Sequence, residues 1–282
     1  MKIQYLGTAA AEGIPAIFCK CESCTQARKR GGKNIRTRSQ ALIDGKLLID
    51  FPADTYYHSL LYGFDLADIR HILITHTHSD HLYPNDIGMR IPGFSSLGRS
   101  EEEMLNFYGS AGAMKRINSY MSQLEFKHDD FIGLHPLTPY AENKVGDYTV
   151  IPLEAVHDVT SHPFIYIIIA PDGKSLLYAN DTNYFADKVW EYLEKTDIKF
   201  DFVSLDCTDA NIENRTYIGH MNLNENINVK NRLTELCRAD EKTIFCSNHF
   251  SHNGTDVLYE DFSELAKAQG FLTSVDGMTV EF

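Results

Sequence analysis

Residues 75–81 have the sequence THTHSDH, an H-x-H-x-D-H motif with four candidate metal ligands within six positions. The ligands, His76, His78, Asp80 and His81, follow the apolar run 72–74, which is typical of a buried strand. A strand points alternate side chains to one face, so a loop must gather the others. His76 and His78 could then face one metal while Asp80 and His81 face a second. Several imidazoles with a carboxylate suit Zn²⁺, Mn²⁺ or Fe²⁺. The alternative is a polar, solvated loop that is rich in histidine.

The composition restricts the classes of function. The chain has 282 residues and 43% hydrophobic content, which fits an ordinary globular core. No repeat, low-complexity tract or linker is visible, so residues 1–282 are expected to form a single domain. Lys and Arg total 26 against 39 Asp and Glu, giving a formal net charge of −13. Such a surface repels polyphosphate backbones and argues against binding of a large nucleic acid. A small phosphate ester stays compatible, because bound metals would set the local field.

The sequence also restricts the cellular location. The opening segment 1–6 lacks the layout of a signal peptide, and no apolar run is long enough to span a membrane. The protein is therefore expected to be cytoplasmic, with no membrane partner. The six cysteines then indicate thiols or metal ligands more than disulfides.

Strands precede helices in both halves of the chain, and candidate ligands follow several strands. An apolar hairpin is predicted around Asp44-Gly45, a strong turn signal. The basic stretch 26–38 is predicted to be a surface loop, and 100–125 to form helical pieces over the site. The other strands are predicted at 3–6, 148–156, 164–170, 175–179, 202–205 and 243–246, and the helices at 56–62, 187–195, 224–237 and 256–268.

Nearly the whole chain resembles the metallo-β-lactamase superfamily. The Leu6-Gly7-Thr8 opening, the H-x-H-x-D-H motif, His157, Asp181 and His249 occur in the order of that family. The resemblance implies an α/β (α+β) fold, a four-layer αββα sandwich with two divalent metals, Zn or Mn, at one edge of the sheets. It also implies the ligand sets: His76, His78 and His157 for the first metal, Asp80, His81 and His249 for the second, and Asp181 as the bridge. Taken alone, His157 could instead be a strand-end histidine and Asp181 a turn or cap residue.

A second metal site is predicted at Cys19, Cys21 and Cys24, a C-x-C-x-x-C cluster. Three thiolates suit a tetrahedral structural zinc that needs one further ligand. His249 is already assigned to the reactive pair, so His252, three positions later, is the natural fourth. The alternative is a set of reduced, buried thiols. The remaining cysteines, Cys207, Cys237 and Cys246, are expected to be core thiols.

This combination resembles one branch of the superfamily. The branch contains the cyclic-phosphate phosphodiesterase of the bacterial carbon–phosphorus lyase pathway, which pairs a dinuclear site with a Cys₃His zinc. The pyrroloquinoline-quinone biosynthesis protein shares the cysteine cluster, so the cluster does not identify a substrate. The present chain departs from the phosphodiesterase by extra residues around 94–130, and whether these form a lid stays open.

His220 lies in Gly219-His220-Met221-Asn222, directly before a predicted helix. A helix N-terminus attracts phosphate oxygens, and imidazole suits a general acid near neutral pH. The resemblance implies that a histidine in this region binds the phosphate or protonates the leaving oxygen. His220 is thus the candidate general acid, oriented by Asp206 at its strand end, and with Asp80 these form the catalytic set. The alternatives are a packing histidine at a helix start and a turn carboxylate.

Together these features predict a metal-dependent hydrolase, a phosphodiesterase acting on a small, perhaps cyclic phosphodiester through a hydroxide activated by two metals. One alternative is a hydrolase of a lactone, thioester or β-lactam. Another is a non-catalytic carrier similar to the pyrroloquinoline-quinone biosynthesis protein. Loss of a bridging ligand would be the sign of a carrier, and this chain keeps Asp181. The expected partner is a small-molecule phosphoester, and a homodimer is left open.

Overall fold

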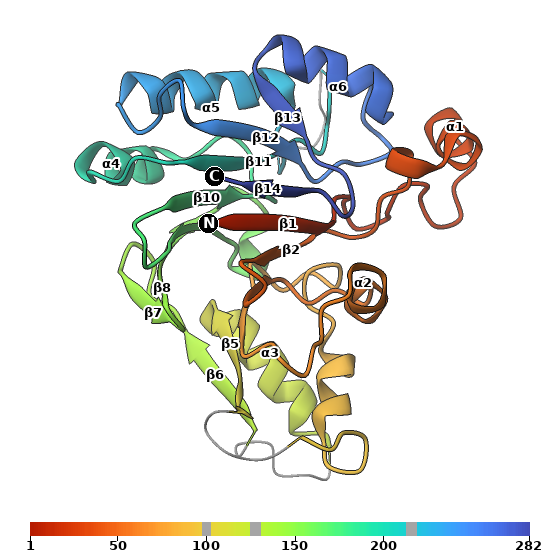
Figure 1. Cartoon of the computed structure of the whole chain (residues 1–282), viewed down its shortest axis with the longest axis vertical. Helices are drawn as coiled ribbons and strands as arrows, with labels where there is room; N and C mark the ends of the chain where they lie inside the picture. Colours follow the sequence, from red (N-terminus) through yellow and green to blue (C-terminus); the bar gives the residue numbers. More distant parts are fainter. Residues whose placement is uncertain (98–102, 125–130, 213–218) are drawn as a thin grey trace.

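Two seven-stranded sheets stack face to face, with helices on their outer sides (Figure 1). This computed structural model describes residues 1–97, 103–124, 131–212 and 219–282. The first sheet has the order β14-β1-β2-β3-β4-β5-β6 and the second the order β13-β12-β11-β10-β9-β8-β7. The strands of the first sheet are β1 (Lys2–Gly7), β2 (Gln40–Ile43), β3 (Leu47–Ile49), β4 (His71–Leu73), β5 (Leu105–Gly109), β6 (Ile132–Pro136) and β14 (Thr279–Glu281).

The second sheet and the helices complete the layers. Its strands are β7 (Asn143–Val145), β8 (Tyr148–Glu154), β9 (Phe164–Ile169), β10 (Ser175–Ala179), β11 (Phe202–Asp206), β12 (Ile244–Asn248) and β13 (Phe271–Thr273). The helices are α1 (Glu22–Arg30), α2 (Thr55–Tyr62), α3 (Ala111–Met121), α4 (Asp187–Lys195), α5 (Leu223–Glu235) and α6 (Tyr259–Ala268), with 3₁₀ turns at Gly32–Asn34, Pro84–Arg90 and Val159–Ser161. Among the described helices, none has the length and apolar character needed to cross a bilayer.

Strand direction brings the ligand-bearing loops to one edge of the sandwich. Strands β3, β4, β5 and β6 run parallel to one another, as do β10, β11, β12 and β13. The carboxyl ends of parallel neighbours meet at the same edge of a sheet, which is where α/β proteins bind ligands. The hairpin of β2 and β3 forms as predicted, because Asp44 and Gly45 both take the positive φ angles that a tight turn requires.

Three apolar cores hold the four layers together. Tyr166 and Ile168 belong to the core between the sheets, where the Tyr5 hydroxyl also donates to Oγ of Ser204 at 2.8 Å. Trp190 and Phe262 lie in the core under α4, α5 and α6, which cover the second sheet. The third core packs α3 against the first sheet. The four-layer sandwich predicted from the sequence is therefore confirmed.

Three local predictions were wrong. The stretch 26–38 does not form only a loop, because α1 extends to Arg30, after its N-terminus is capped by the Cys21 side chain. Residues 105–109 form strand β5 rather than helix, since they pair in parallel with β4. Cys237 is exposed, whereas Cys207 and Cys246 are buried as expected. Residues 98–102 and 125–130, part of the segment considered as a lid, lie outside the described residues.

Candidate metal centre and active site

The seven predicted ligands come together from both sheets. The motif of residues 75–81 follows β4, His157 follows β8, Asp181 follows β10, and His249 follows β12. Asp181 and His249 adopt left-handed backbone conformations, with φ of 50° and 66°. Such conformations are costly for residues other than glycine and tend to occur at functional sites.

Three ring nitrogens of the first predicted set converge. Nε2 of His76 lies 2.9 Å from Nδ1 of His78, which lies 3.2 Å from Nε2 of His157. Ligands of a tetrahedral zinc are about 3.3 Å apart when the Zn–N bonds measure about 2.0–2.1 Å. The spacing of these nitrogens therefore fits a shared cation.

The second predicted set forms a buried group beside the first. Nε2 of His81 lies 3.4 Å from Nε2 of His249 and 3.2 Å from Oδ2 of Asp80. These ligand atoms all lie within 4.8 Å of one another. Imidazole and carboxylate together suit Zn²⁺ or Mn²⁺.

Asp181 lies between the two groups. Its Oδ2 is 2.8 Å from Nε2 of both His81 and His249, and its Oδ1 is 3.8 Å from Nε2 of His157. Oδ2 is buried, yet it has no partner with hydrogen-bond geometry among the described residues. A buried carboxylate oxygen without a hydrogen bond is costly. Two cations held by the neighbouring histidines would satisfy it, so the donor set fits a dinuclear centre with Asp181 as the bridge.

Residues that contact the candidate ligands from the side away from the centre fix which ring nitrogen of each histidine faces it. These supporting residues were not identified from the sequence. Nδ1 of His81 lies 2.7 Å from Oδ2 of the fully buried Asp50, which also accepts from the backbone N–H of Thr75. Nδ1 of His249 lies 2.8 Å from Oγ1 of Thr208. These contacts leave Nε2 of both histidines directed at Asp181, as outer partners of metal ligands commonly do. Only the position of Asp50 after a predicted strand could have suggested its role.

The charges of the bare side chains favour a cation at this position. Burial alone would lower the pKa of His81, but Asp181, Asp80 and Asp50 together raise it well above its usual value. Burial alone would raise the pKa of Asp181, but His249 and His81 lower it well below its usual range. Anionic carboxylates thus surround the imidazoles, and positive charge at their centre is stabilised.

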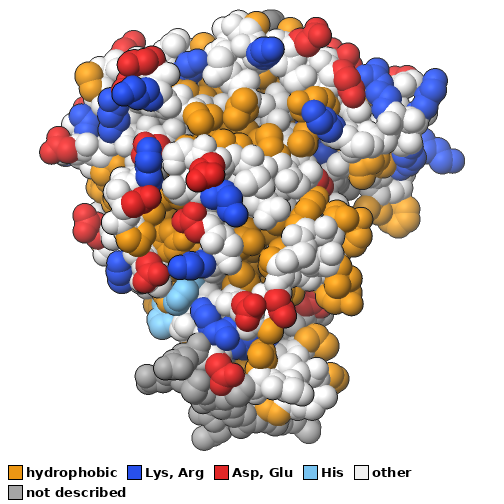
Figure 2. Space-filling model, viewed as in Figure 1, with side chains coloured by type: hydrophobic (Ala, Val, Ile, Leu, Met, Phe, Trp, Pro, Cys, Tyr) orange, Lys and Arg blue, Asp and Glu red, His pale blue; other side chains and the backbone are white. Residues whose placement is uncertain are grey.

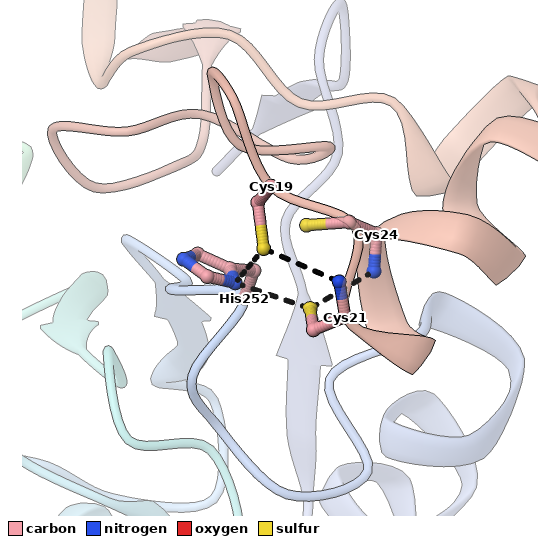
Figure 3. Close-up of side chains that lie close together, drawn as sticks. All are labelled: Cys19, Cys21, Cys24 and His252. Atoms are coloured by element: carbon pink, nitrogen blue, oxygen red, sulfur yellow. Dashed lines mark hydrogen bonds between the residues drawn. The ribbon is translucent and has the colours of Figure 1, made fainter.

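The cysteine cluster forms a separate site near the surface (Figure 3). Nδ1 of His252 lies 3.6 Å from Sγ of Cys19 and 3.4 Å from Sγ of Cys21. Cys24 completes the group, whose ligand atoms lie within 4.8 Å of one another. Sulfur and nitrogen ligands of a tetrahedral zinc are about 3.5–3.6 Å apart for bonds of about 2.3 and 2.0–2.1 Å. The four residues therefore fit a structural zinc that ties α1 to the loop after β12.

A cavity of about 560 Å³ opens over the dinuclear group. His220 lines it, with Nδ1 2.9 Å from Oδ2 of Asp206 and its ring centroid 4.8 Å from that of His157. Burial alone would lower the pKa of His220, but the charge and hydrogen bond of Asp206 raise it to about 9. His220 and Asp206 thus lie together beside the candidate metal ligands. Within the described part of 94–130, no residue lines this cavity.

The start of α5 differs from the expected phosphate site. Asn222 caps the helix by accepting from the backbone N–H of Glu225, and the Glu225 carboxylate accepts from the N–H of Asn222. This capping box uses N–H groups that would otherwise bind an anion. The two N–H groups of the capping box are thus already paired, while the His220 side chain lines the cavity.

The outer surface carries mixed charge. Figure 2 shows acidic and basic side chains interspersed over the face it presents, with Lys and Arg gathered on the right. The α1 helix lies there in Figure 1, and its last turn carries Arg28, Lys29 and Arg30. This basic group lies on the side of α1, outside the residues that line the cavity.

Comparison with known proteins places the chain in a family. A model described as a β-lactamase superfamily domain matches residues 54–240, two thirds of the chain. A crystal structure of a diphosphatase from the PhnP family is similar with a TM-score of 0.74 and 20% identity, covering 100% of this chain and 97% of that one. Zinc-bound PqqB from Methylobacterium extorquens gives 0.74 and 16%, with 100% of both chains covered.

Human short-form tRNase Z is also similar, with a TM-score of 0.64 and 16% identity over 100% of this chain and 99% of that one. Among curated proteins, none matches this sequence. At such identities the solved structures show a shared fold, while the family model and the buried His and Asp group indicate a metal-dependent hydrolase. The chain belongs to the metallo-β-lactamase superfamily.

Proposed function

We propose that this hydrolase is a phosphodiesterase that cleaves a small phosphodiester. The observation that carries the proposal is the place of His220. It lines the same cavity as His78, Asp80 and Asp181, and Asp206 holds its Nδ1 atom. An alkoxide is a poor leaving group, so cleavage of a dialkyl phosphate benefits from a positioned general acid.

Different groups in the cavity would carry out different parts of the proposed reaction. Bound divalent cations would lower the pKa of a water molecule and offset phosphoryl charge. His220 would donate a proton from Nε2 to the departing oxygen, while Asp206 stabilises the imidazolium through Nδ1. Thr208 supports this pair, because its Oγ1 lies 3.1 Å from Nδ1 of His220 and 3.2 Å from Oδ2 of Asp206.

The experiment compares bond types in one purified preparation loaded with Mn²⁺ or Zn²⁺. Bis(4-nitrophenyl) phosphate tests the phosphodiester, and a nitrophenyl ester, a lactone and a β-lactam test the other bonds. The proposal expects the highest kcat/KM for the phosphodiester. Faster cleavage of a carbon ester or lactone would overturn it. Thermal stabilisation by cyclic nucleotides or quinones, with no turnover of any substrate, would instead support a carrier.

A further inference from the structure

Helix α2 presents its large apolar side chains to solvent. Four of them are each between 53% and 65% exposed, and we call them the α2 face: Tyr56, Tyr57, Leu60 and Leu61. Their spacing of i, i+1, i+4 and i+5 places them together on one side of the helix. Figure 2 shows hydrophobic side chains gathered where α2 lies in the same view of Figure 1. The outer side of α2 is therefore an apolar surface.

The two buried side chains of the same helix are polar. Oγ1 of Thr55 donates to the carbonyl oxygen of Pro52 and accepts from the side-chain amide of Gln40. The ring nitrogens of His58 each lie 2.7 Å from an oxygen, one of Gln40 and one of Thr37. A surface helix normally buries its apolar stripe and exposes its polar residues. Helix α2 has the reverse arrangement, and exposed apolar patches of this kind mark interaction sites.

The α2 face also lacks charge. Residues 55–62 contain no Lys, Arg, Asp or Glu, although the whole chain carries a formal net charge of −13. Two copies of an acidic chain repel each other, and like charges placed opposite one another in an interface are costly. A two-fold contact brings the same patch of each copy together, so it requires a surface without such repulsion. The α2 face meets this requirement.

An anionic membrane suits this surface less well. Helices that lie on such membranes carry Lys and Arg beside their apolar side. The charged residues within 51–68 are all acidic: Asp54, Asp65 and Asp68. Arg38 approaches the start of the helix, but it is paired with Asp54 at 3.0 Å. The charges around α2 therefore favour a protein partner over an anionic lipid surface.

The size of the α2 face suits a dimer. Taking about 200 Å² for a large side chain that is fully exposed, the four side chains expose roughly 450 Å² of mostly apolar surface. An interface of ordinary size buries about 800 Å² on each partner, of which roughly 57% is apolar. The apolar share is thus about 450 Å² on each partner. One α2 face from each copy supplies this share.

We propose that the protein forms a two-fold symmetric homodimer in which the α2 face of one copy packs against the α2 face of the other. The eight side chains form the apolar centre of this interface, and polar residues around them form its rim. Tyr56 and Leu60 are the most exposed of the set and lie one helical turn apart, so they carry most of the contact.

Sedimentation equilibrium of the metal-loaded protein tests this proposal. Wild-type protein at micromolar concentration is expected at twice the 32.0 kDa mass of one chain. Leu60→Lys is expected to raise the Kd of the dimer by about thirtyfold or more, because a charge enters the apolar centre from each copy. Leu265→Lys makes the same change on the exposed face of α6 and should keep the wild-type Kd.

A milder variant and a second measurement complete the test. Leu60→Ala adds no charge and keeps a good helix former, so it decides the question if Leu60→Lys does not fold; it should raise Kd by a smaller factor. The melting temperature of the wild-type protein should rise with protein concentration, whereas that of Leu60→Lys should not. Wild-type protein that sediments as a monomer would overturn the proposal, including a monomer that binds phosphatidylcholine vesicles. A dimer with the same Kd in the Leu60 variants and in Leu265→Lys would also overturn it.

Discussion

Nδ1 of His220 lies 2.9 Å from Oδ2 of Asp206, a carboxylate with no exposure to solvent. The other oxygen, Oδ1, accepts from the backbone N–H groups of Thr208 and Met221. These backbone hydrogen bonds therefore fix the orientation of the Asp206 carboxylate that faces the imidazole. Such a pair fixes the ring tautomer and orientation, as in other acid–base pairs.

His220→Ala is expected to reduce kcat for a dialkyl phosphodiester by about 10²–10⁴-fold, because the leaving alkoxide loses its proton donor. The loss should be smaller for bis(4-nitrophenyl) phosphate, whose leaving group needs less protonation. Elemental analysis should give the wild-type metal content, since His220 belongs to neither predicted ligand set. Full activity of this variant on the dialkyl substrate would remove His220 from the mechanism.

Asp206→Asn should move the pH profile as well as lower kcat. The Asp206 carboxylate raises the pKa of His220 against the opposing effect of burial, to about 9. A general acid must be protonated, so activity falls as pH rises through its pKa. Removal of the carboxylate lowers that pKa, and the alkaline limb of kcat/KM should begin at lower pH. An unchanged alkaline limb with reduced kcat would indicate a purely structural role for Asp206.

Substitution of the two histidines in the loop after β12 should distinguish the two predicted metal sites. Wild-type protein is expected to contain close to three metals per chain. His249→Ala should lose metal from the reactive pair and keep the zinc at the cysteine cluster, because its Nε2 lies close to Asp181 and His81, whereas the fourth member of that cluster is His252. His252→Ala should lose the cysteine-bound zinc and melt at lower temperature, since structural zinc contributes to folding.

Elemental analysis with a thermal melt checks this pair of variants. Each histidine serves as the control for the other, because both lie in one loop within three residues. Equal metal loss in the two variants, or no loss in His252→Ala, would contradict the assignment of separate sites.

The sequence pointed to the candidate metal ligands that converge in the fold because most of them follow a recognisable pattern. His76, His78, Asp80 and His81 are concentrated in one motif, and strand ends placed the other ligands at the same edge. The supporting residues were missed because their roles depend on pairs that exist only in the folded chain. Asp50 meets His81 across 31 positions. A local sequence pattern cannot show that two residues so far apart in the sequence are in contact.

The errors in secondary structure have a similar cause. Strand β5 was predicted as helix, whereas parallel pairing with β4 and β6 decides the conformation of residues 105–109. Helix α1 was missed because its charged sequence looks like a solvated loop, whereas the Cys21 side chain caps it. Tertiary pairing and capping overrode local propensity in both segments.

His58 allows a test of stability against pH away from the metal site. It is fully buried, with Nδ1 2.7 Å from Oε1 of Gln40 and Nε2 2.7 Å from Oγ1 of Thr37. Burial lowers its pKa to about 4 from an ordinary value of 6.5, against a smaller opposing effect of Asp54. Between these two pH values, His58 is protonated in the unfolded chain and neutral in the folded chain.

The free energy of unfolding should therefore fall as pH drops from about 6.5 to 4, by at most about 3 kcal/mol from this group. His58→Gln removes the proton that the unfolded chain binds at this position. Urea unfolding at pH 7 and pH 4.5 should show a variant that is less stable than wild type at pH 7, with a smaller difference at pH 4.5. His162→Gln, which removes an exposed histidine, should follow the wild-type curve. A His58→Gln curve parallel to wild type would mean that folding does not change the pKa of His58 and would contradict this prediction.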